Sequence, residues 1–141
     1  MNEYKFENLE IGQKESFQVV ITEKMVDSFR KLTGDVNPLH IDDGFAKEVG
    51  DGKFSRHISF GMLTASFYST LAGVYLPGKY SLIHSIDIKF QKPVYAGEQL
   101  EIEGKIISKQ EELKLIEIKA IIYNGQRNKV SQAKIRVILT K

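Results

Sequence analysis

The chain has 141 residues, of which 42% are hydrophobic and 27% charged, a composition typical of one ordinary folded domain and unlike that of disordered or fibrous proteins. Its 20 basic and 18 acidic residues are well mixed and leave a net charge of +2, which argues against a nucleic-acid partner. The absence of cysteine excludes disulfides, thiolate catalysis and cysteine-ligated zinc, and it is consistent with a cytoplasmic protein.

The first half of the chain is predicted to be mainly helical. Residues 15–21 alternate in hydrophobicity and are predicted to form a short strand. Apolar residues at helical spacing predict a helix over residues 22–33, capped by Thr22 and ended by Gly34. Asp42 is expected to cap a second, shorter helix. The N-terminus is too polar for a secretion signal, and no apolar run approaches the roughly 20 residues of a membrane span.

The stretch from Phe60 to about Tyr75 differs from the first helix because it has almost no polar face. A helix of this kind is expected to be buried nearly all round. At 1.5 Å per residue it would be roughly 24 Å long, enough to run through the middle of a small domain. Leu76-Pro77-Gly78 is expected to end it.

The remainder of the chain is predicted to consist of strands, at residues 80–90, 100–106, 113–123 and 130–139. On the first of these strands, alternation assigns His84 to the apolar face, as a core residue. Asn124-Gly125 predicts a type I′ hairpin between the last two strands. A long buried helix with antiparallel strands indicates an α+β fold, with the sheet curled around the helix. Pairing with a second copy would cover a free sheet edge, which favours a homodimer.

The most informative segment for function is the loop from Asp35 to His40. Gly34 and Pro38 prevent it from continuing the preceding helix, so an ordered loop is expected to direct both side chains into one cleft. A histidine titrating near neutral pH and a carboxylate in a dry pocket form a potential acid–base pair. From these residues alone a second interpretation stays open, in which Asp35 caps a turn and His40 makes a structural hydrogen bond.

A wider pattern surrounds this pair. Asp35-x-Asn37-Pro38-x-His40, followed by Phe60-Gly61-Met62 at the start of an apolar helix, resembles the hydratase motif of the MaoC-like hot-dog-fold proteins, which include (R)-specific enoyl-CoA hydratases. The similarity extends over nearly the whole chain and includes Leu32-Thr33-Gly34, Leu76-Pro77-Gly78-Lys79 and Phe90-x-Lys92-Pro93-Val94-x-x-Gly97-Glu98. It implies a single hot-dog domain over residues 1–141, with a long central helix wrapped by a curved antiparallel sheet, and a dimer.

The resemblance also implies the chemistry. Asp35 and His40 would add water to a trans-2-enoyl thioester, or remove it from an (R)-3-hydroxyacyl thioester, carried by coenzyme A or acyl carrier protein. His40 would activate the water, and Asp35 would help to orient it and supply the proton at the α-carbon. Asn37 would support this geometry, and Ser69 would lie near Asp35. The Gly61 N–H would bind the thioester carbonyl, a role that suits a helix N-terminus.

One position departs from the family pattern. Phe60 stands where the family usually has a histidine, and we expect Phe54 and Phe60 to make the mouth of the pocket more apolar. Arg56 or Lys53 is expected to contact a phosphate of the thiol carrier. We interpret His57 as an exposed loop residue rather than a replacement for the missing histidine.

Three other functions remain open from the sequence: a hot-dog acyl thioesterase, a non-catalytic acyl-thioester-binding module, and a dehydratase dedicated to one pathway. The intact Asp35-to-His40 spacing favours the hydratase over the thioesterase. No metal or organic cofactor is predicted, because three scattered histidines and no cysteine make poor ligand sets.

Overall fold

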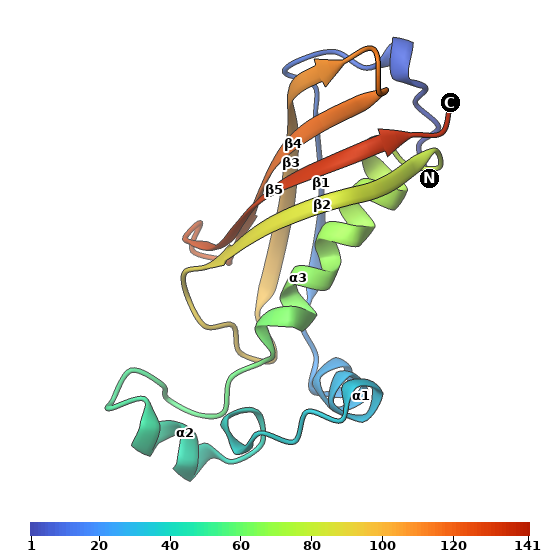
Figure 1. Ribbon diagram of the computed structural model, residues 1–141. Coiled ribbons are helices and arrows are strands. Elements are labelled where there is room, and N and C mark those ends of the chain that lie inside the picture. Colours follow the sequence, from blue (N-terminus) through green and yellow to red (C-terminus); the bar gives the residue numbers. More distant parts are fainter.

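The computed structural model describes residues 1–141, and its main feature is an antiparallel sheet in the order β1-β3-β4-β5-β2 (Figure 1). The alternating segments predicted from the sequence form these strands, which are β1 (Lys14–Val20), β2 (Ser81–Phe90), β3 (Gln99–Gln110), β4 (Leu115–Tyr123) and β5 (Lys129–Leu139). Because the two edge strands are β1 and β2, the sheet remains open on both sides.

The long central helix packs against the inner face of this sheet (Figure 1). It consists of α3 (Gly61–Thr70), which continues as a single π-helical turn, η3 (Leu71–Tyr75). The strand register sets Ile106, Ile118 and Ile135 directly opposite one another, and all three are fully buried. This packing confirms the prediction of an α+β fold with the sheet curled around a central helix.

Burial of α3 is less complete than its composition indicates. Gly61, Met62, Ser66 and Ser69 form an exposed stripe along the helix. The sheet covers only one side of α3, so the opposite side stays open in a single chain. The prediction that this helix is buried nearly all round was therefore wrong for one face.

Strand β2 contains a bulge that the sequence did not reveal. Ile83 pairs with Val137 and Ser85 with Arg136, so His84 is an extra residue on β2. Because of this extra residue, the side chains before and after the bulge alternate out of step. Leu82 therefore lies on the opposite face of the strand from Ile86. His84 is exposed, and its prediction as a core residue was wrong.

The connection between β4 and β5 also differs from the prediction. The Asn124 N–H donates to the Asn128 carbonyl (2.9 Å), and the Arg127 N–H donates to the Asn124 carbonyl (3.0 Å). The residue with positive φ is Arg127, at 62°, and Gly125 is not among the residues with positive φ. The loop is therefore longer than the two-residue type I′ turn that Asn124-Gly125 predicted, although the strands pair as expected.

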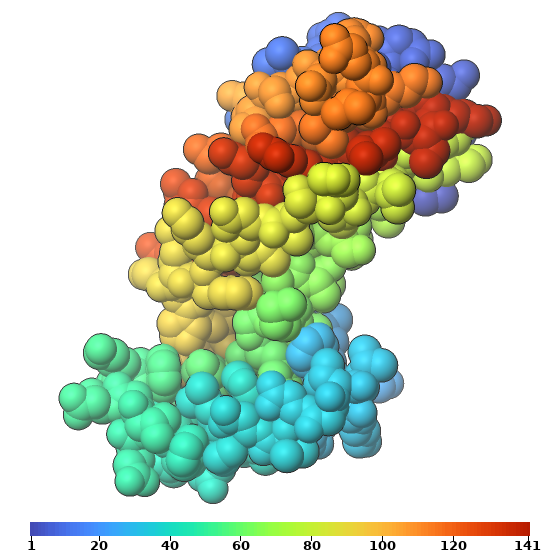
Figure 2. Space-filling model, viewed as in Figure 1, coloured from blue at the N-terminus to red at the C-terminus, as the bar shows by residue number.

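Residues between β1 and α3 form an overhang beyond the end of the sheet, opposite the two chain termini (Figures 1 and 2). The overhang contains α1 (Glu23–Thr33), the short 3₁₀ turn η2 (Pro38–His40) and α2 (Asp43–Val49), and another such turn, η1 (Phe6–Asn8), precedes β1. The predicted caps are confirmed: Thr22 and Asp42 accept backbone N–H groups, and Gly34 ends α1 with φ of 73°. None of the helices has the length and apolarity needed to cross a membrane.

Candidate active site

The loop after α1 is shaped by successive hydrogen bonds between side chains and nearby backbone. The Asp35 N–H donates to Thr33 Oγ1 (3.3 Å), and the Asn37 N–H donates to Asp35 Oδ1 (3.1 Å). Asn37 Oδ1 in turn accepts the Leu39 N–H (3.0 Å) and starts the turn η2. These local turns explain why a segment that cannot be helical is still ordered. They leave Asp35 Oδ2 without a hydrogen-bond partner in the chain.

His40 is held by one hydrogen bond and one ring contact. Its Nδ1 lies 2.9 Å from the Ile58 carbonyl oxygen. Because a carbonyl oxygen only accepts, Nδ1 carries the proton, and Nε2 of the neutral ring keeps a free lone pair. The imidazole also packs on the Phe60 ring, with centroids 4.0 Å apart, and Phe60 packs on Phe29 at 5.0 Å. His40 therefore has both the tautomer and the support that a general base requires.

A cavity of about 450 Å³ brings the predicted site residues together. Asp35, His40, Phe60 and Gly61 all contribute to its lining, which consists of Phe29, Thr33, Asp35, His40, Phe60, Gly61, Met62 and Phe90. Gly61 is the first residue of α3, so its N–H has no acceptor within the helix. A Cβ at this position would lie only 3.1 Å from the Phe90 ring, so glycine permits this close packing. The cavity thus combines a carboxylate, an imidazole and a helix N-terminus.

Other predicted residues lie outside this cavity. Asn37 accepts the Leu39 N–H and thereby orders the loop. Ser69 lies about two turns along α3, on its exposed stripe. The Arg56 guanidinium donates to the Ala96 carbonyl (2.6 Å), and Phe54 lines a neighbouring cavity. Within one chain, therefore, the structure groups four of the seven predicted site residues.

Comparison with known proteins decides the family. Residues 5–123 match the sequence model of a protein family, the MaoC like domain. The chain belongs to the MaoC-like family. It is 36% identical over 106 residues to an (R)-specific enoyl-CoA hydratase of Aeromonas caviae, covering 75% of this chain and 77% of the relative. A 3-hydroxybutyryl-CoA dehydratase of Methylorubrum extorquens is 33% identical over 101 residues, covering 72% of this chain and 62% of the relative.

Solved structures agree with this assignment. An (R)-hydratase from A. caviae involved in PHA biosynthesis superposes with a TM-score of 0.85 at 31% identity, covering 93% of this chain and 97% of that one. The unliganded R-hydratase PhaJ1 from Pseudomonas aeruginosa gives a TM-score of 0.85 at 25% identity, with 95% and 84% coverage. The expected hot-dog fold is thereby confirmed for this MaoC-like chain.

In this MaoC-like chain, His57 has a structural role that the sequence did not indicate. Its Nδ1 lies 2.6 Å from Asp43 Oδ1 of α2, and its Nε2 lies 2.9 Å from Glu23 Oε1 of α1. Since both carboxylates only accept, both ring nitrogens donate and the ring is an imidazolium. Its side chain is only 19% exposed, so His57 is less exposed than predicted, although it does lie in a loop and does not line the cavity with Asp35 and His40. His57 joins the two helices on either side of the loop from Asp35 to His40.

This network predicts that the overhang loosens at high pH. The hydrogen bond that His57 Nδ1 donates to Asp43 is the main cause that raises the pKa of His57 above its usual 6.5. The stabilisation is therefore complete below pH 6.5 and is lost as the pH rises through the raised pKa. The backbone N–H of His57 is the main cause that lowers the pKa of Asp43 from 3.8, and that contribution is lost only in acid.

We expect amide hydrogen exchange in α2, corrected for intrinsic rates, to be slower at about pH 5.5 than at about pH 8.5. His57→Gln should remove this difference, whereas His84→Gln, which changes an exposed histidine on β2, should preserve it. An unchanged pH dependence in His57→Gln would contradict the role assigned to this network.

Proposed function

We propose that this protein catalyses the reversible hydration of trans-2-enoyl thioesters to (R)-3-hydroxyacyl thioesters. The observation that carries the proposal is His40, whose Nδ1 bond to Ile58 leaves Nε2 basic in the same cavity as the Asp35 carboxylate. The names of the relatives, an (R)-specific enoyl-CoA hydratase and a 3-hydroxybutyryl-CoA dehydratase, support this class of reaction. Thioesters of coenzyme A or acyl carrier protein are the proposed substrates.

In the proposed mechanism, His40 Nε2 takes a proton from water as the water oxygen attacks the β-carbon of the enoyl group. The electron pair of the double bond moves toward the thioester carbonyl, and the α-carbon then receives a proton. Asp35, oriented by its bond to the Asn37 N–H, helps to hold the water and passes to the α-carbon the proton that His40 has taken from that water, so both side chains return to their starting states. Dehydration follows the same steps in reverse.

The proposed site for the developing negative charge is the N-terminus of α3. The unpaired Gly61 N–H would donate to the thioester oxygen, and the positive end of the helix dipole would stabilise it further. A preorganised donor of this kind contributes about 10²- to 10³-fold to the rate in other enzymes.

The remaining predicted residues have supporting roles in the proposal. Asn37 positions the catalytic loop rather than touching substrate. Arg56, with 40% of its side chain exposed, stays a proposed contact for a carrier phosphate, using the N–H groups not engaged with Ala96. A cytoplasmic location likewise stays a prediction.

Two simultaneous readings test the reaction class. Crotonyl-CoA is incubated with the protein while the absorbance of the enoyl thioester and the release of free thiol are both followed. We expect the absorbance to fall without thiol release. Thiol release in step with substrate loss would instead identify a thioesterase, and a stable absorbance with crotonyl-CoA, longer enoyl-CoAs and carrier-protein thioesters would leave a binding module.

We also propose a homodimer formed through β2. This strand is a free sheet edge, and its inner face exposes large apolar side chains, among them Ile86 at 39% and Phe90 at 51%. Met62 and Ser69 lie on the exposed stripe of α3. Met62 also lines the cavity that contains Asp35 and His40, together with Phe90. A second copy would cover this apolar surface and close the cavity. We assign Ser69 a role near the site only in this dimer.

We expect wild-type protein to sediment with twice the 16.0 kDa mass of one chain. Ile86→Lys places a charge on the proposed interface and should yield monomers with much reduced hydratase activity. Leu82→Lys makes the same change on the outer face of β2 and should preserve the dimer. A monomeric wild type, or a fully dimeric Ile86→Lys variant, would contradict this interface.

A further inference from the structure

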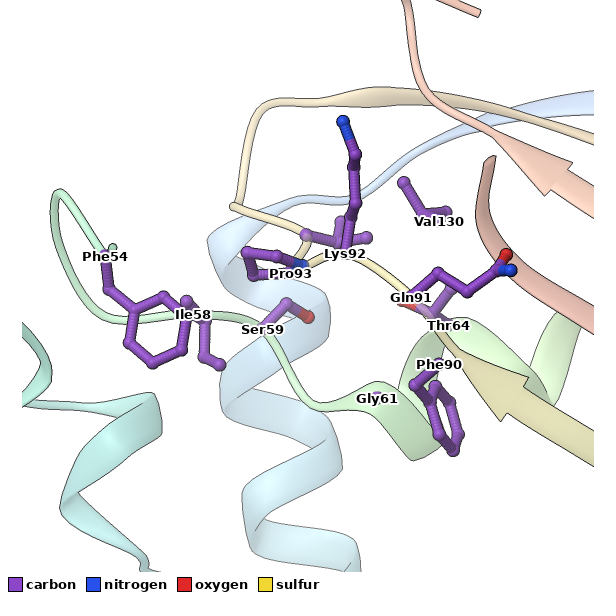
Figure 3. A pocket seen from close by; sticks show the side chains of 11 residues that line it. Phe54, Ile58, Ser59, Gly61, Thr64, Phe90, Gln91, Lys92, Pro93 and Val130 are labelled. Carbon is purple, nitrogen blue, oxygen red and sulfur yellow. The ribbon is translucent and has the colours of Figure 1, made fainter. Parts of the chain in front are cut away.

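A second cavity of about 260 Å³ adjoins the catalytic one. The two share Gly61 and Phe90, so they lie on either side of the contact between this glycine and the Phe90 ring. Figure 3 shows the second cavity between the loop that carries Phe54 and Ser59 and the segment that follows β2. Pro93 and Val94 of that segment also line it.

Two hydroxyl groups in this cavity have no hydrogen-bond partner. The side-chain oxygens of Ser59 and Thr64 are both buried and unpaired, and the residues are only 5% and 2% exposed. Figure 3 shows the Ser59 hydroxyl directed toward the interior of the cavity. The Ser59 N–H donates to the Val94 carbonyl (2.7 Å), and the Thr64 N–H donates to the Phe60 carbonyl (3.2 Å), so both residues are held in place. Since buried unpaired hydroxyls destabilise a fold, a ligand that pairs with them would recover that loss.

The proposed reaction indicates which part of the substrate reaches these hydroxyls. The thioester carbonyl carbon bears the α-carbon on one side and the sulfur on the other. If the carbonyl binds at Gly61, the α- and β-carbons must face Asp35 and His40 in the first cavity. The sulfur and the chain beyond it then turn toward the second cavity. In thioesters of coenzyme A and acyl carrier protein alike, two methylene groups and then an amide follow the sulfur.

We propose that Ser59 and Thr64 are specificity-determining residues that hydrogen-bond this first amide of the thiol arm. An amide offers one donor and one acceptor, which two hydroxyl groups can satisfy together. Phe54 and Ile58 line the same cavity and provide apolar contacts for the methylene groups. The inference rests on the proposed function, and it predicts discrimination between thioesters of amide-bearing thiols and those of simple alkyl thiols.

The test compares two small crotonyl thioesters of equal chain length, one of N-acetylcysteamine and one of pentanethiol, which lacks the amide. We expect wild type to prefer the amide-bearing thioester in kcat/KM by about tenfold to a hundredfold, the size expected for two hydrogen bonds. Ser59→Ala combined with Thr64→Val should reduce this preference to near unity. Its Tm should be equal to or above that of wild type, because the substitutions remove unpaired buried hydroxyls.

A matched control makes the same two kinds of substitution, serine to alanine and threonine to valine, at two other positions, both on α3. Ser66→Ala with Thr70→Val alters residues that line neither cavity and should keep the full preference. Comparing crotonyl-CoA with crotonyl-acyl carrier protein then tells which carrier supplies the amide. A preference unchanged in the Ser59/Thr64 variant would overturn the inference while leaving the hydratase function intact.

A binding measurement separates this inference from the reaction itself. Butyryl-CoA has no double bond to hydrate, and its Kd is measured by calorimetry. We expect the Ser59/Thr64 variant to raise that Kd by about tenfold or more. Should the protein hydrate no thioester yet show this change in Kd, the proposed reaction fails and the amide contact stands. An unchanged Kd would contradict the contact whatever the activity.

Discussion

Replacing Asp35 or His40 is expected to lower kcat/KM for crotonyl-CoA by about 10²- to 10⁴-fold, the contribution typical of general acid–base catalysis. Asp35→Asn keeps an oxygen that can accept the Asn37 N–H, so the loop is preserved while the proton donor is lost. His40→Asn keeps an N–H donor for the Ile58 carbonyl and removes the base. The effect therefore falls on the chemistry rather than on folding.

Asp27→Asn is the matched control for this pair. Asp27 is an exposed residue of the same overhang, paired only with Arg30, and its replacement should leave kcat/KM unchanged. Circular dichroism and Tm establish that each variant is folded. Wild-type activity in folded Asp35→Asn or His40→Asn would remove that residue from the mechanism.

Replacement of Phe60 is expected to impair both stability and turnover. Phe60 is buried, with its ring against Phe29 and His40. Phe60→Ala should lower the free energy of unfolding by about 3–5 kcal/mol, as for other buried aromatic residues. It also removes the surface that holds the His40 ring. We therefore expect kcat to fall strongly while KM changes little, measured well below the Tm of the variant.

Phe67→Ala separates these two effects. Phe67 packs against the core from α3 but does not line the cavity that contains Asp35 and His40. This variant should lose stability yet keep its kcat at temperatures where it is folded. If Phe60→Ala also keeps its kcat there, the role of Phe60 is limited to packing.

Much of the fold could be predicted because local signals agree with the tertiary structure. Thr22, Gly34 and Asp42 delimit the helices through hydrogen bonds to backbone groups three or four residues away in the sequence. The bulge at His84 was missed because alternation continues on both sides of it and only the register with β5 reveals the extra residue. The exposed stripe of α3 was missed because composition does not tell which apolar surface a single chain covers.

The candidate site was predicted in part for a similar reason. Asp35 and His40 are close in sequence, and the turns that order their loop are local. The contact that fixes the His40 tautomer joins it to Ile58, 18 residues away, and no local pattern encodes it. The bonds of His57 to Glu23 and Asp43, likewise, depend on how the two overhang helices pack.

The configuration of the product tests the central claim most directly. Crotonyl-CoA is converted by the wild-type protein, and the 3-hydroxybutyryl-CoA formed is resolved by chiral chromatography after hydrolysis. Water delivered by His40 to one face of a substrate held at Gly61 should give the (R) product alone. Formation of the (S) or racemic product, or no hydration, would contradict the account.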